Sequence, residues 1–175
     1  MVVLVIVLFL STVTGVVAAQ SIQGTSGTIV VKEGETVSSV DALAGTIVIR
    51  GTVTGAVSGA AGDVRIDGEV RGGVTAGSGN VQVTETARIG GDGSVGAGYV
   101  RTDGRIDGDV RAGAETIVIG PNAEVGGEFR YDADSFTQDP AAAVVGGVVE
   151  DGLDVRHLLT HSLRVLRDAR RRVVW

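Results

Sequence analysis

The chain has 175 residues, of which 28 are glycine and only 2 are proline, and aromatic residues make up 3% of it. One domain with short appendages fits this length, and a glycine excess without proline indicates an ordered, turn-rich pattern rather than a disordered tract. The absence of cysteine excludes disulfides and thiol chemistry, and an excess of 21 acidic over 15 basic residues disfavours nucleic-acid binding, which requires a cationic surface.

The first segment of the chain, residues 1–19, is almost wholly apolar and has no charged side chain. It ends on Val17, Ala18 and Ala19, small residues that suit a signal-peptidase site before Gln20. A signal peptide is therefore predicted. The length is also close to the ~20 residues that cross a bilayer, so a retained membrane anchor stays open. Either interpretation predicts an exported or membrane-associated protein, and an anchor also leaves the cytoplasmic face open.

Residues 27–133 repeat with a period of seventeen to nineteen residues. Units of seventeen residues span 45–61, 62–78 and 98–114, and units of nineteen span 79–97 and 115–133. Within each unit β-branched residues alternate with polar ones, which predicts strands, and glycine or Asp-Gly pairs break these strands into short runs. Three short strands per unit predict an all-β, three-sided (triangular) solenoid of about six coils that pair in parallel.

Residues at equivalent positions of successive units are expected to stack inside the solenoid as its core. This predicted core comprises Ile47, Ile49, Val53, Val57, Val64, Ile66, Val70, Val74, Val81, Val83, Val100, Ile106, Val110, Ile117 and Ile119. One coil buries too little apolar surface to offset the entropy lost when its backbone is ordered. The coils must therefore stabilise one another, and the unpaired edges at the ends of the rod are templates for adding another copy.

The last unit differs from the others because it carries Phe129 and Tyr131, with Phe136 just beyond it. These aromatic side chains mark a candidate assembly end. They either form an end-to-end contact between subunits or cap the rod and block its growth, and the sequence leaves both open.

The runs GDVRIDGEVRGGVTAG and GRIDGDVRAG resemble the bactofilin family, also called polymer-forming cytoskeletal proteins, over residues 27–133. The resemblance implies a right-handed triangular β-helix that polymerises end to end with itself and without nucleotide, as a scaffold. The long apolar leader departs from the short membrane-targeting tail common in the family. The two units of nineteen residues also predict bulged corners near Gly90 to Gly93 and Gly126.

After a predicted linker at 134–152, the alternation is lost and residues 153–175 are predicted to form a basic amphipathic α-helix with Val155, Leu159, Ser162 and Leu166 on its apolar face. Its cationic side chains include Arg164, Arg167, Arg170, Arg171 and Arg172. This helix is expected either to cap the acidic solenoid or to lie on an anionic membrane surface, and docking to a partner helix is a third option.

No residue is nominated as catalytic, and no cofactor, metal site or small-molecule substrate is predicted. His157 and His161 have a metal-binding spacing, but the glutamate of a metalloprotease helix is missing between them. Solenoid acyltransferases and carbonic anhydrases rely on histidines in the coils, where this chain has none. The sequence predicts a self-assembling scaffold at the membrane or cell envelope. The alternative is a monomeric surface adhesin or carbohydrate-binding module that uses the outward Arg and Asp side chains.

Overall fold

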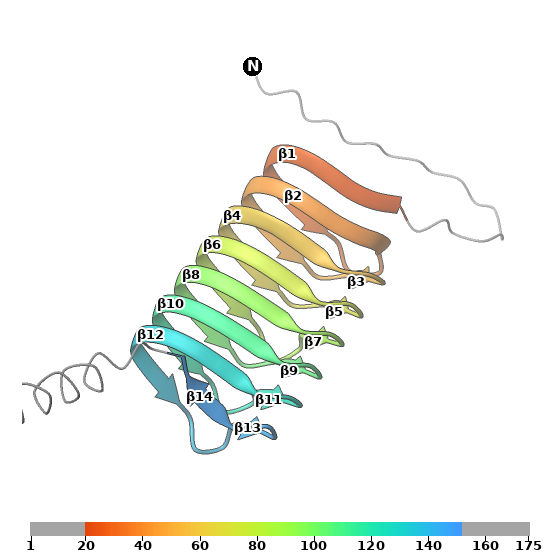
Figure 1. Cartoon of the computed structure of the whole chain (residues 1–175). Helices are drawn as coiled ribbons and strands as arrows, with labels where there is room; N and C mark the ends of the chain where they lie inside the picture. The colour runs from red at the N-terminus through yellow and green to blue at the C-terminus, as the bar shows by residue number, and fades with distance from the viewer. Residues whose placement is uncertain (1–19, 152–175) are drawn as a thin grey trace, which may run out of the picture.

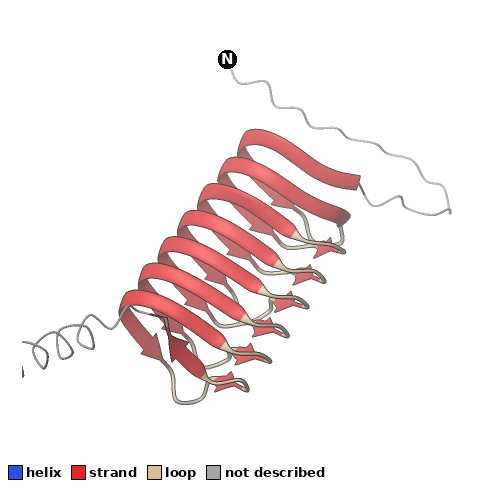
Figure 2. Ribbon diagram, in the orientation of Figure 1, coloured by secondary structure: helices blue, strands red, loops and turns tan. Residues whose placement is uncertain are grey.

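The computed structural model describes residues 20–151, which form a rod of stacked β-strands with no helix in that range (Figures 1 and 2). The long strands are β1 (Gln20–Val31), β2 (Thr36–Ile49), β4 (Val57–Ile66), β6 (Val74–Val83), β8 (Gly93–Thr102), β10 (Val110–Ile119) and β12 (Phe129–Gln138). The short strands are β3 (Thr52–Val53), β5 (Glu69–Val70), β7 (Arg88–Ile89), β9 (Arg105–Ile106), β11 (Glu124–Val125), β13 (Ala143–Val144) and β14 (Val148–Glu150).

Between the two ends of the rod, each long strand pairs in parallel with the strand one coil before it and the strand one coil after it, and the short strands β5, β7, β9 and β11 do the same. The predicted all-β solenoid is confirmed, with about seven coils rather than about six. The pairing also skips one residue inside each long strand, and in most strands this residue is a glycine: β4 pairs with β6 up to Ala61 and again from Asp63, leaving out Gly62, whereas β10 leaves out Glu115. The long strand therefore supplies two sides of a coil and the short strand supplies the third.

The solenoid extends beyond the predicted limits of 27 and 133 at both ends, since β1 begins at Gln20 and β14 ends at Glu150. The linker prediction for 134–152 is wrong up to residue 150. Phe136 pairs with Ile117 of the coil below, and Val144 pairs with Val125. The alternation is hard to recognise here because Phe136 and Gln138 stand at the inward positions that Ile117 and Ile119 occupy on the preceding coil.

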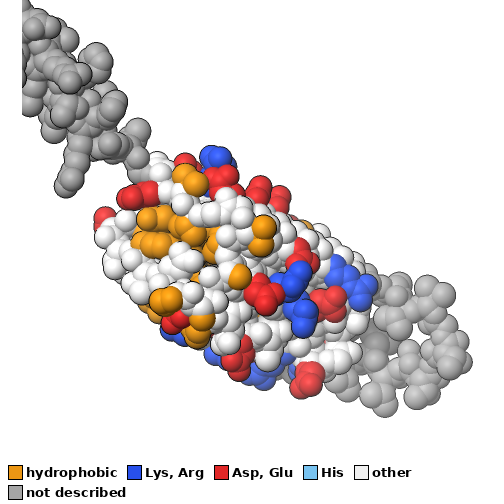
Figure 3. Space-filling model, turned by 90° about the horizontal axis from the view of Figure 1, so that it is seen from below, with side chains coloured by type: hydrophobic (Ala, Val, Ile, Leu, Met, Phe, Trp, Pro, Cys, Tyr) orange, Lys and Arg blue, Asp and Glu red, His pale blue; other side chains and the backbone are white. Residues whose placement is uncertain are grey.

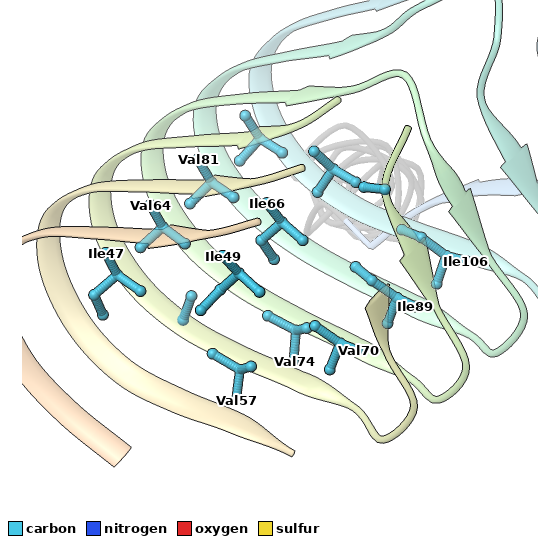
Figure 4. Close-up of a cluster of buried hydrophobic side chains, with 14 of the residues drawn as sticks. Ile47, Ile49, Val57, Val64, Ile66, Val70, Val74, Val81, Ile89 and Ile106 are labelled. Atoms are coloured by element: carbon cyan, nitrogen blue, oxygen red, sulfur yellow. The ribbon is translucent and has the colours of Figure 1, made fainter. Parts of the chain in front are cut away.

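The core is a set of parallel ladders of branched side chains (Figure 4). All the residues of the predicted core are buried, with exposed fractions of 5% or less. Ile49, Ile66 and Val83 lie in register on three successive coils, as the repeat requires. Thr102 continues this ladder as a buried polar residue, and Ile119 follows it. The repeat therefore stacks equivalent inward residues, all of them β-branched in this ladder, from Ile49 to Ile119.

The two extra residues of the longer units lie at a different corner from the predicted one. They fall between the long and the short strand, at residues 84–87 and 120–123, where the amide of Ala87 donates to the carbonyl of Thr84 and that of Ala123 donates to the carbonyl of Gly120. The bulges predicted near Gly90 to Gly93 and Gly126 are wrong. Gly90, Gly91 and Gly126 serve close packing of coils: a Cβ on Gly90, for example, would lie 2.6 Å from the carbonyl oxygen of Arg71.

One of the narrower corners is closed by an aspartate that its neighbours hold ionised. At the corner after β4, Asp67 Oδ2 accepts a hydrogen bond from Arg65 Nε at 2.9 Å. Burial by itself raises the pKa of Asp67, but hydrogen bonds from Arg65 and Thr84 and the charges of Arg65 and Arg50 outweigh it, so the pKa is lowered. Because Thr84 belongs to the next coil, this carboxylate links two coils.

Gly93→Ala is expected to stabilise the fold. Gly93 is buried in a ladder between Val74 and Val110, and an added Cβ would lie 3.6 Å from Val110 Cγ2, an ordinary contact. A buried methyl group and a less flexible unfolded chain together raise the free energy of unfolding by about 1 kcal/mol. Thermal unfolding followed by circular dichroism should show a higher midpoint. Gly68→Ala is the control and should lower it, because its Cβ would collide with the carbonyl oxygen of Gly51. A lower midpoint for Gly93→Ala would contradict the packing.

Asp67→Asn is expected to destabilise the fold only where the carboxylate is ionised. A lowered folded-state pKa contributes stability above the unfolded value of about 3.9, and that contribution is lost as the pH falls below it. The variant should lose about 1 kcal/mol of unfolding free energy at pH 7 and match the wild type near about pH 2. Urea unfolding at both pH values measures this. Asp41→Asn, at an exposed position, is the control. Equal destabilisation at both pH values would refute the role of the charge.

Candidate assembly site

The last coil ends the rod with its core side open. Inward side chains of the preceding coil are fully covered: Ile117 is 0% exposed and Val125 is 1% exposed. Their successors on the last coil are only partly buried, since no full coil of the described residues stacks on them. These apolar residues form what we call the end patch, namely Tyr131, Phe136, Ala142, Val144 and Val148. Figure 3 shows hydrophobic side chains gathered at this end of the rod, with charged residues around them.

Aromatic rings fill the centre of this end. The rings of Tyr131 and Phe136 stack with their centroids 4.0 Å apart and an interplanar angle of 15°. Phe129 lies beneath them, with its centroid 6.3 Å from that of Phe136 and a tilt of 48°. Phe129 is 0% exposed and is covered by Val148, its register partner in β14. It therefore belongs to the core, whereas Tyr131 and Phe136 lie on the end surface.

Among the described strands, the backbone at this end also has no partner on its outer edge along most of its length. β14 pairs only with Phe129, Arg130 and Tyr131, the first three residues of β12. Within residues 20–151 the rest of β12 has a strand partner on one side alone, namely β10. Free amide and carbonyl groups on such an edge are a template for another parallel strand. The end therefore presents both hydrogen-bonding groups and apolar surface to a stacking partner.

The opposite end is bounded by β1, which among the described residues pairs only with β2. Its inward side chains Ile29 and Val31 are 8% and 0% exposed. Apolar residues are also exposed nearby on the outer face, with Val30 at 38% and Leu43 at 60%. The two ends thus differ in their apolar residues: the C-terminal end includes aromatic side chains, whereas the apolar side chains named at the N-terminal end are all aliphatic.

The charged side chains of the outer faces pair with one another. Arg105 Nε lies 2.7 Å from Asp107 Oδ1, and Arg105 Nη1 lies 3.0 Å from Glu124 Oε2 on the next coil. The hydrogen bond and charge of Asp107 are the main reasons why the pKa of Arg105 is raised. Arg101 is paired in the same way with Asp103 at 2.7 Å. These pairs leave little net charge on the middle of the rod for an external ligand.

The structure separates the predicted site residues into three groups. Phe129 is a core residue, and Tyr131 and Phe136 lie together in the end patch. The third group lies outside the described residues. It comprises the N-terminal segment 1–19 and the predicted helix 153–175, with His157, His161, Arg164, Arg167, Arg170, Arg171 and Arg172. Val144 and Val148 belong to the end patch but were not predicted from the sequence. Their spacing of nineteen residues from Val125 and Phe129 was the signal that would have identified them.

Between residues 20 and 151 no group of three or more His, Cys, Asp or Glu side chains is placed to hold a metal ion. Over the same residues no helix is long and apolar enough to cross a membrane.

Comparison with known proteins identifies the family. The model of the family described as "Bactofilin: Polymer-forming cytoskeletal" matches residues 55–149, which is more than half of the chain. No curated protein and no solved structure matches it. The matched range runs from the second coil to β14 and so includes the end patch. The family predicted from the sequence is confirmed, and the chain belongs to the bactofilins, a structural family of polymer-forming cytoskeletal proteins.

Proposed function

We propose that this chain assembles by end-to-end stacking of its solenoids, without nucleotide, into filaments that act as a scaffold at the membrane or cell envelope. The right-handed winding implied by the resemblance belongs to the same proposal. The observation that supports stacking most directly is the open last coil, where a half-exposed apolar core and an unpaired strand edge coincide.

The energetics of the fold favour such stacking. Every interior coil is stabilised by a coil on each side, whereas within residues 20–151 the terminal coils have a neighbouring coil on one side only. A second molecule placed on the end would cover the end patch and pair the free edge of β12. The same interactions that hold the coils together would then hold the subunits together.

The location rests on the sequence of residues 1–19, which lie outside the described part of the chain. As an anchor they would fix each subunit at a membrane, and as a signal peptide they would direct the solenoid to the envelope. Stacking of anchored rods would produce a filament or patch parallel to the membrane. This would suit a scaffold that organises other components at the cell boundary.

Val144→Asp is expected to weaken assembly of the full chain. The substitution places a carboxylate in the end patch, where stacking would bury it without a partner, and such burial costs several kcal/mol. The concentration needed for filament formation should rise by about tenfold or more. Sedimentation measures this concentration, and negative-stain microscopy of the wild-type chain shows whether filaments form.

The control variant Tyr99→Asp also introduces a carboxylate, but on the outer face of β8, where Tyr99 is 38% exposed. This control should alter the threshold by less than about twofold. Far-UV circular dichroism should show the same strand content in both variants. Unchanged assembly by Val144→Asp would exclude the last coil as the joint. Dispersed short rods formed by the wild type would instead favour the monomeric adhesin or carbohydrate-binding alternative.

A further inference from the structure

The coil that carries the end patch is acidic, and we call its carboxylates the acidic rim. Residues 128–151, which form the last coil and the start of the next, contain six carboxylates and one arginine, a net charge of −5. The acidic residues are Glu128, Asp132, Asp134, Asp139, Glu150 and Asp151. One of these charges is compensated locally, because Arg130 Nε lies 2.8 Å from Glu128 Oε1. The middle of the rod, where arginines and carboxylates alternate, has no comparable excess of one sign.

The segment that follows has the opposite composition. Residues 152–175 contain six arginines and two aspartates, a net charge of +4 with neutral histidines, and they contain the only tryptophan of the chain. Their apolar residues recur at spacings of three and four, which predicts one apolar face. An apolar face bordered by arginines is complementary to an apolar patch bordered by carboxylates.

This segment begins directly beside the end patch. The amide of Asp151 donates a hydrogen bond to the carbonyl of Tyr131 at 2.7 Å, so residue 152 starts beside a member of the patch. A short tether of this kind gives an effective concentration in the millimolar range. As a helix the segment would be about 36 Å long, whereas one side of a coil of about five residues measures about 17 Å. It is long enough to cover the end.

We propose that residues 152–175 fold back onto the end patch of their own chain and cap the open C-terminal end of the solenoid. The apolar face would cover Tyr131, Phe136, Val144 and Val148, and the arginines would face the acidic rim. If the solenoids stack end to end as proposed above, the cap also regulates that assembly, because the cap and an incoming subunit compete for the same surface. Release of the segment then permits stacking.

Cross-linking tests the docking without depending on assembly. The chain has no cysteine, so Gln138→Cys and Ser162→Cys introduce the only two thiols. Gln138 continues an inward ladder above Ile119 on the last coil, and Ser162 lies on the predicted apolar face. The full chain, reconstituted at low density in neutral phosphatidylcholine vesicles, is treated with a short bismaleimide cross-linker. Mass spectrometry then measures the link within one chain.

The matched control is Thr137→Cys with Ser162→Cys. Thr137 has nearly the same tether length but points to the outer face, since it pairs with Val118 rather than with an inward residue. Docking should give at least about tenfold more intrachain product from position 138 than from position 137. Replacing Arg164, Arg167, Arg170 and Arg171 by glutamate should remove that excess, because the charges then repel.

Three results would overturn the cap. Equal yields from positions 137 and 138 would mean that the segment does not rest on the end. Links between chains alone would mean that it docks on a neighbouring copy. A link that forms in neutral vesicles but is lost when anionic phosphatidylglycerol is included would mean that the segment prefers a membrane surface to the end patch.

The regulatory part has its own readout. Deleting residues 152–175 should lower the concentration needed for filament formation by about tenfold, which sedimentation of the full and shortened chains measures. An unchanged threshold, with the intrachain link present, would show that the segment docks without controlling assembly. If neither chain forms filaments while the link forms, the proposed end-to-end assembly fails and the docking stands.

Discussion

The constraint on which the whole molecule depends is that each coil must lie in register on the next. No coil buries enough apolar surface by itself to offset the entropy of ordering its backbone. Stability comes from ladders such as the one through Ile49, Ile66 and Val83, and from parallel hydrogen bonds between neighbouring coils. Any residue that prevents two coils from reaching their spacing therefore weakens the rod on both sides of it.

Variation is tolerated where it does not disturb this register. The corners at 84–87 and 120–123 take two extra residues because their middle residues, 85–86 and 121–122, are exposed, and the strands on either side resume the same ladders. Charged residues are confined to the outer faces, where they pair between coils, as Arg105 does with Glu124. The outer surface of the middle of the rod therefore carries little net charge. Within residues 20–151 the stacking of coils is incomplete only at the two ends.

An incomplete pattern is what a polymer-forming protein needs. The last coil presents a half-exposed core and a free strand edge, so the interaction that stabilises the fold is also available between molecules. Such an edge is a hazard if it is always exposed, because it also pairs with wrong partners. A segment of opposite charge placed directly after it would suit the control of that exposure, and this links assembly to the composition of residues 152–175.

The sequence by itself determined the solenoid, its period and the core, because alternation and recurrence are local properties that residues such as Val64 and Val81 carry individually. Only the tertiary structure decided where the extra residues of the longer units lie, since two corners of a coil accept an insertion equally well until the register of both neighbours is known. It also decided where the rod ends: β14 covers Phe129, which the sequence placed at the surface. Burial depends on what stacks above a residue, and that is not encoded at the residue itself.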